Sequence, residues 1–208
     1  VSGLIVASCG GADSPDTMQP DLATTTSSTT TTVAPTTTVD PAGSFTESDL
    51  VYLTRLEDGA TATLDIHLPA EPSGAPLVIG ADESLAAEGV IVVTFDDDDH
   101  LGGTDSIEAL LEDRAEVRTI AEQYACAIRL ARERAAALGN EDPIIVLNGL
   151  SFVGGVTAHV ALFGDAFEAR WDEFAGSDGP PRQYECEAPE GSTHVDAFIG
   201  MAGTYDIF

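Results

Sequence analysis

Ser151 is the side chain in this sequence whose surroundings best suit nucleophilic chemistry. An apolar, β-branched run at 144–147 and a turn at 148–150 precede it, and the mostly small or apolar segment 153–163 follows. These features predict a buried strand, a tight turn and a helix, which would lift the Ser151 Oγ clear of a sheet. The N–H of Phe152, at the helix N-terminus, would then point where negative charge develops on an attacked carbonyl. The alternative is an ordinary strand–helix unit in which Ser151 only caps the helix.

The elements that must position this turn can be read from hydrophobic runs and turn residues along the chain. Strand-like and helix-like segments alternate, and the apolar run at 144–147 is typical of a strand in a parallel sheet. The expected elements are an antiparallel hairpin at 50–69, strands at 76–79 and 90–95 with a short helix at 81–88 between them, a helix at 106–138 broken near 112–116, and a strand at 195–201. The segment 164–193 is expected to be loop-like.

The turn has the spacing of a known motif. Gly149 and Ser151 occupy two positions of the pattern G-x-S-x-G, while Val153 stands at the third and Gly154 follows it. The stretch resembles the nucleophile elbow of α/β-hydrolases, most closely the secreted esterase- and lipase-like members, and the resemblance covers roughly residues 50–208. It implies an α/β fold with a mostly parallel sheet, an N-terminal antiparallel hairpin and helices on both faces. It also implies a serine hydrolase that acts on small-molecule carboxylic esters without a cofactor or metal. Ser151 would be the nucleophile, Phe152 would supply an oxyanion N–H, and Gly149 and Gly154 would be the elbow glycines.

The partners that such a nucleophile requires are not found at the family positions. In this family an acid and then a histidine follow the serine, but the histidines after Ser151 are His159 and His194. The strand at 76–79 is followed by Gly80 alone, where the family has a glycine-rich loop that supplies a second oxyanion donor. We therefore expect an incomplete hydrolase domain at 49–208, lacking its C-terminal part. The alternative is a non-catalytic lipoprotein that keeps a degenerate hydrolase scaffold for binding or structure.

The N-terminal residues resemble an export signal. Residues 1–9 have the character of a signal-peptide remnant, and Val6-Ala7-Ser8-Cys9 resembles the lipobox of bacterial lipoproteins, in which Cys9 would be lipidated. Residues 10–48, rich in Thr, Ser and Pro, predict a disordered linker. These features favour a monomer held by a lipid anchor on the outer side of the cell membrane. The alternative is a free cysteine in a disordered tail.

Charge and cysteine content restrict the remaining possibilities. The formal net charge is −28 and no lysine is present, so the surface repels nucleic acid and anionic headgroups. Cys126 and Cys186 are the cysteines left after Cys9, and outside the cytoplasm such a pair predicts a disulfide, with two free thiols as the alternative. The acidic run 96–99 is expected to be a solvated loop, not a metal site.

Overall fold

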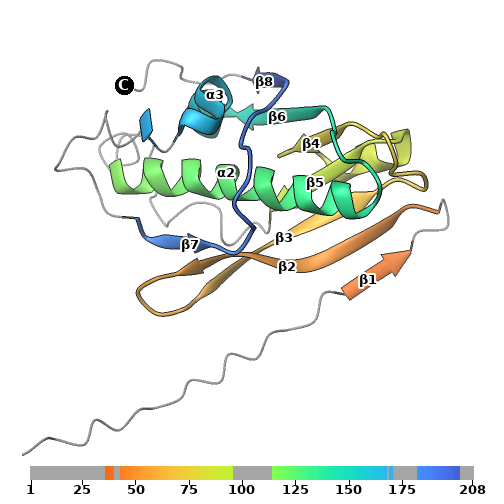
Figure 1. Ribbon diagram of the computed structural model, residues 1–208, viewed down its shortest axis with the longest axis horizontal. Coiled ribbons are helices and arrows are strands. Elements are labelled where there is room, and N and C mark those ends of the chain that lie inside the picture. The colour runs from red at the N-terminus through yellow and green to blue at the C-terminus, as the bar shows by residue number, and fades with distance from the viewer. Residues whose placement is uncertain (1–35, 40–42, 96–113, 168, 171–181, 202–208) are drawn as a thin grey trace, which may run out of the picture. The chain divides into compact units, whose positions relative to one another are not determined.

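The computed structural model describes residues 36–39, 43–95, 114–167, 169–170 and 182–201. The chain divides into two units, 1–32 and 33–208, and every described residue belongs to the second. In chain order the elements are β1 (Thr36–Val39), β2 (Phe45–Arg55), β3 (Thr61–Leu68), β4 (Leu77–Ile79), η1 (Glu83–Glu88), β5 (Ile91–Phe95), α2 (Arg114–Ala137), β6 (Ile145–Leu150), α3 (Ser151–Phe163), η2 (Gly164–Ala166), β7 (Tyr184–Cys186) and β8 (Ala197–Met201) (Figure 1).

The strands form one mixed sheet. Their order is β1-β2-β3-β5-β4-β6-β8, and β7 pairs with β2 beside this path. The strands β5, β4, β6 and β8 pair in parallel, whereas β1, β2, β3 and β7 make antiparallel pairs. The predicted α/β architecture, with an antiparallel hairpin before the parallel strands, is therefore confirmed.

Two strands lie where the sequence predicted none. The linker was expected to run to residue 48, yet Thr36–Val39 form β1 and β2 begins at Phe45, so these residues belong to the sheet. The short β7 lies in the segment expected to be a loop. Threonine and valine suit strands, and the outer edge of β2 gives both segments a partner, with β1 along residues 45–48 and β7 along 53–55. A partner strand covers an edge that would otherwise be open.

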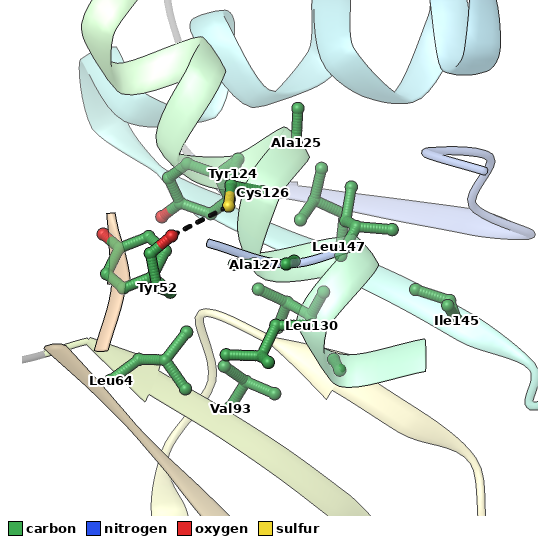
Figure 2. Close-up of a cluster of buried hydrophobic side chains, with 14 of the residues drawn as sticks. Tyr52, Leu64, Val93, Tyr124, Ala125, Cys126, Ala127, Leu130, Ile145 and Leu147 are labelled. Carbon is green, nitrogen blue, oxygen red and sulfur yellow. Dashed lines mark hydrogen bonds between the residues drawn. The ribbon is translucent and has the colours of Figure 1, made fainter. Parts of the chain in front are cut away.

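The long helix α2 covers one face of the sheet. Leu64 of β3 and Val93 of β5 point to this face of the sheet and are buried. On the same face, the ring centroids of Phe95 in β5 and Tyr124 in α2 are 4.8 Å apart. Figure 2 shows the helix laid over these side chains together with Ile145 and Leu147 of β6. The helix α3 packs beside α2 on the same face. Within the described part of the chain, no helix is long and apolar enough to cross a membrane.

The opposite face carries η1. The imidazole nitrogens of His67 lie 3.0 Å from the hydroxyls of Thr46 and Thr94, on the side of the strands that points away from α2. Glu83, the first residue of η1, places a carboxylate oxygen 3.8 Å from His67 Nε2. Helices therefore lie on both faces of the sheet, as expected.

The η1 face is less covered at β6 and β8. In this pair Asn148 lies opposite Ile199 and Leu150 opposite Met201, so that Leu150 and Ile199 share one face. Leu150 is 58% exposed and Ile199 51% exposed. On the other face of β6, Ile145 and Leu147 are fully buried under the helices. An apolar surface therefore remains in contact with solvent at this side of the sheet.

Candidate active site

The turn that carries Ser151 joins a buried strand directly to a helix. The strand β6 ends at Leu150, which takes the cap position in an extended conformation (φ −112°, ψ 140°) without a side-chain cap, and α3 begins at Ser151. The backbone N–H groups of Ser151 and Phe152 are among the first of the helix, which have no carbonyl partner within it. They lie at the positive end of the helix dipole, a suitable place for developing negative charge. The structure gives the cap position to Leu150 and makes Ser151 the first residue of the helix.

A close approach between strand and helix shapes the turn. A Cβ added to Gly149 would lie 2.2 Å from Thr157 Oγ1 and 2.7 Å from the Cα of Gly154. Both glycines are thus at the contact, and a side chain at position 149 would force the helix away from the strand. Val153, at the third position of the motif, is half-buried and packs against the core. Gly154, one residue after the third position of the motif, therefore lies where the strand and the helix meet.

The turn lies at the carboxyl ends of the parallel strands, at a point where the connections after neighbouring strands pass to opposite faces of the sheet. The neighbouring strands β4 and β6 continue into η1 on one face and α3 on the other, and ligands of open α/β sheets bind at such a point. Gly80 follows β4 directly, with φ of +78°. Its N–H donates to the carbonyl of Val93 at 2.9 Å, and its own carbonyl accepts from Asn148 Nδ2 at 2.6 Å. The edge next to the turn is therefore tied to both neighbouring strands.

The buried phenol of Tyr124, in α2, packs close to Gly80 at this edge. A Cβ on Gly80 would lie 3.4 Å from the hydroxyl oxygen of Tyr124, which is 4% exposed. Burial raises the pKa of Tyr124, so the hydroxyl is neutral throughout the physiological range. Tyr124 lies in the middle of α2. Its approach to Gly80 depends on how the helix crosses the sheet, for which the sequence offered no signal.

Neither histidine that follows Ser151 lies at this edge. His159 is eight residues along α3, about 12 Å of helix rise from Ser151, and its Nδ1–H donates to the carbonyl of Gly155 at 2.8 Å. His194 contacts Gly164, just beyond the far end of α3, with its Cα 3.5 Å from the position of an added Cβ. Neither is placed to accept the proton of Ser151, in agreement with the sequence analysis.

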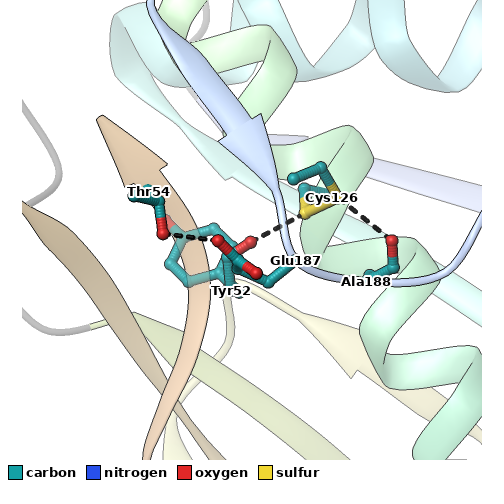
Figure 3. The surroundings of a disulfide bond; sticks show 6 residues. Tyr52, Thr54, Cys126, Glu187 and Ala188 are labelled. Atoms are coloured by element: carbon teal, nitrogen blue, oxygen red, sulfur yellow. Dashed lines mark hydrogen bonds between the residues drawn. A yellow bond between two sulfur atoms is a disulfide. The ribbon is translucent and has the colours of Figure 1, made fainter. Parts of the chain in front are cut away.

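The structure joins Cys126 to Cys186 in a disulfide, with the two Cα atoms 5.6 Å apart. The bond ties β7 to α2 beside β2, where the N–H of Glu187 donates to the carbonyl of Tyr52 at 2.9 Å and Thr54 Oγ1 donates to the Glu187 carboxylate at 2.5 Å (Figure 3). Cys9 and the acidic run 96–99 lie outside the described residues. Among the residues that the structure describes, no group of three or more His, Cys, Asp and Glu is arranged to hold a metal ion.

A pocket lies beside the disulfide and is separate from the Ser151 turn. Glu122, Arg129, Phe167 and Tyr184 are among the residues that line it, whereas Gly80 and Asn148 are not. Burial raises the pKa of Glu122, although Arg118 and Arg182 act in the opposite direction. The carboxylate is held by Arg118 Nε at 2.7 Å, and Arg182 Nε lies 3.5 Å away. This pocket therefore has an ion-paired wall and offers no nucleophile.

Comparison with known proteins bears on the fold. No model of a known protein family matches the chain, and no curated protein matches it. A tannin acyl hydrolase in complex with 3,4-dihydroxybenzoate is 13% identical with a TM-score of 0.50, and the match covers 83% of this chain and 43% of that one. The tannase of Fusobacterium nucleatum is 13% identical, with a TM-score of 0.49 and coverage of 81% and 41%. The propionate-bound esterase 2 of Thermogutta terrifontis is 19% identical, with a TM-score of 0.42 and coverage of 74% and 55%.

The match to tannin acyl hydrolase supports the fold described above. The fold is α/β-hydrolase-like. Identities this low carry the fold alone. The chain spans less than half the length of that hydrolase, of which 43% is covered.

Proposed function

We propose that the protein is a serine hydrolase of carboxylic esters, with Ser151 as its nucleophile. One observation carries the proposal: Ser151 begins α3 directly after β6, on a turn that Gly149 and Gly154 let approach the helix closely. This turn lies at the carboxyl edge of the sheet beside Gly80. Strand, turn and helix in this relation expose a serine hydroxyl in front of free backbone N–H groups.

The reaction follows from this arrangement. Ser151 Oγ attacks the ester carbonyl carbon while its proton passes to a general base, and the carbonyl oxygen becomes an oxyanion. The N–H of Phe152, at the start of α3, donates to that oxyanion. The C–O bond to the alcohol then breaks, the base returns its proton to the alcohol, and water releases the acid from the acyl-serine. Because His159 and His194 lie away from the turn, the proposal places the general base outside the described residues.

The experiment is labelling of the full-length protein from its natural source with a fluorophosphonate probe, which modifies an activated serine. We expect wild type to be labelled and Ser151→Ala to lose the label completely. The control is Ser73→Ala, which removes an exposed serine at the other end of β4 and should leave labelling unchanged. Labelling that survives in Ser151→Ala would exclude this serine as the nucleophile.

A second candidate is a non-catalytic scaffold, and the position of the two histidines away from the turn favours it. It predicts a folded full-length protein that fluorophosphonate does not label and that hydrolyses no p-nitrophenyl ester. Ser151→Ala would then behave as wild type in every assay. The same labelling experiment therefore separates the two candidates.

We also propose that the protein is a lipid-anchored monomer outside the cytoplasm. The lipobox-like Val6-Ala7-Ser8-Cys9 supports the anchor, and the Cys126–Cys186 disulfide suits an oxidising compartment. We expect an alkyne fatty acid fed to cells to label the wild type and not Cys9→Ser, and the variant to leave the membrane fraction. Equal labelling of both proteins would refute lipidation at Cys9.

A further inference from the structure

Asn148 is a polar residue in a strand that is otherwise apolar up to the turn. Its neighbours Ile145 and Leu147 are fully buried, and asparagine is among the residues depleted in strands. The side chain nevertheless has a defined partner, since its Nδ2 donates to the carbonyl oxygen of Gly80 at 2.6 Å. A carbonyl can only accept a hydrogen bond, so the amide nitrogen is the atom that faces it. Asn148 therefore links the nucleophile strand to the end of β4.

This bond takes over where the ladder between the two strands stops. The last pair of β4 and β6 is Ile79 with Leu147, and Gly80 lies one residue beyond it. The Gly80 carbonyl would lack a partner from β6 there, and the Asn148 side chain supplies one. The backbone is close as well, because a Cβ on Gly80 would lie 2.7 Å from the carbonyl oxygen of Asn148.

The bond fixes more than one carbonyl. The N–H of Gly80 is already held by Val93 on the other side, at 2.9 Å. A peptide group is planar and trans, so orienting the Gly80 carbonyl also orients the N–H of Ala81, the next backbone donor at this edge. Gly80 stands alone where the resemblance to α/β-hydrolases predicts a glycine-rich loop. The side chain of Asn148 provides rigidity at that place by another means.

We propose that Asn148 is a positioning residue of the active site, which holds the peptide between Gly80 and Ala81 in a fixed orientation against the turn that carries Ser151. The inference rests on the proposed function. Asn148 lies three residues before Ser151. It acts by holding Gly80 and the turn in place, and it does not touch the substrate. Donors held in place before the reaction stabilise an oxyanion without reorganising, which is the origin of their catalytic effect.

The chain contains a matched control. Asn140 donates from its Nδ2 to the carbonyl oxygen of Ala75 at 2.8 Å and is 6% exposed. This bond ties down the chain just before β4, at the opposite end of the strand from Gly80. It has the same chemistry as the Asn148 bond, although it is more buried, and it lies away from Ser151.

The experiment compares Asn148→Asp, Asn148→Val and Asn140→Asp in the full-length protein with p-nitrophenyl butyrate as the probe. Aspartate keeps the shape and cannot donate, while valine removes the donor without adding charge and suits a strand. We expect both Asn148 variants to lower kcat about tenfold with KM unchanged, since losing an oxyanion donor outright lowers kcat by roughly 10²–10³. Asn140→Asp should lower the urea midpoint by a similar amount and keep kcat within twofold of wild type. Unchanged kcat in Asn148→Val, or an equal loss in Asn140→Asp, would overturn the proposal.

A second measurement separates this inference from the proposed function. Exchange of the Gly80 amide hydrogen, which is bonded to Val93, reports the rigidity of the edge without any catalysis. We expect exchange at least tenfold faster in Asn148→Val and unchanged in Asn140→Asp. Equal exchange in wild type and Asn148→Val would refute the fixed edge itself. An unlabelled wild type with faster exchange in Asn148→Val would instead overturn the hydrolase and leave Asn148 a purely structural tie.

Discussion

The double variant Cys126→Ala/Cys186→Ala should unfold with a free energy about 4 kcal/mol smaller than wild type, because the disulfide restricts the unfolded chain. The two cysteines are 60 residues apart, so the bond closes a long loop. In the folded state it holds β7, whose own ladder with β2 has three residue pairs. Urea denaturation of both proteins measures the difference.

A reducing agent provides the control for this result. It should bring wild type close to the midpoint of the double variant and leave the variant unchanged, since the variant has no bond between these positions to reduce. Equal stability of wild type and variant under oxidising conditions would mean that the two residues are free thiols, the alternative left open by the sequence.

Gly80→Ala should lower the free energy of unfolding by about 3 kcal/mol, combining backbone strain with overlap of packed atoms. With φ of +78°, an alanine at this position takes a left-handed conformation, which opposes folding by about 1 kcal/mol. Its Cβ would also lie 2.7 Å from the backbone carbonyl oxygen of Asn148, so the ends of β4 and β6 must move apart. Fluorophosphonate labelling of Ser151 should slow in parallel, since the same edge borders the nucleophile turn.

Gly74→Ala separates the two contributions. Gly74 has nearly the same backbone conformation, φ of +77°, but a Cβ there would meet nothing within 4 Å. We expect it to lower stability by about 1 kcal/mol, the strain alone. Equal losses in the two variants, measured by urea denaturation, would show that the crowding at Gly80 carries no energetic weight.

The sequence predicted the parts of the fold that depend on local pattern. The apolar run of β6, the helix after it and the antiparallel hairpin were readable because continuous apolar runs, helical spacing and strand alternation leave distinct traces. Of the two faces of β6, only the one toward the helices is fully buried. The strands β1 and β7 were missed because each is three or four residues long and exists only through pairing with β2.

The sequence could predict only those parts of the candidate site whose residues are close together in the chain. Ser151 and its glycines could be recognised from spacing within six residues of one another. The contacts that Asn148 and Tyr124 make with Gly80 could not, since they join residues 44 to 68 positions apart, and the sheet order brings them together only after the crossovers are formed. A single sequence does not encode that order in any short pattern.

The exposed side chains of Leu150 and Ile199 have a consequence for how molecules of this protein meet in solution. Two such surfaces gain free energy by excluding water between them, yet each molecule carries a formal charge of −28. At low ionic strength the repulsion reaches well beyond the molecular surface, and at 1 M salt its range shrinks to about 3 Å. We therefore expect dilute buffer to keep these faces apart and concentrated salt to favour contact between them.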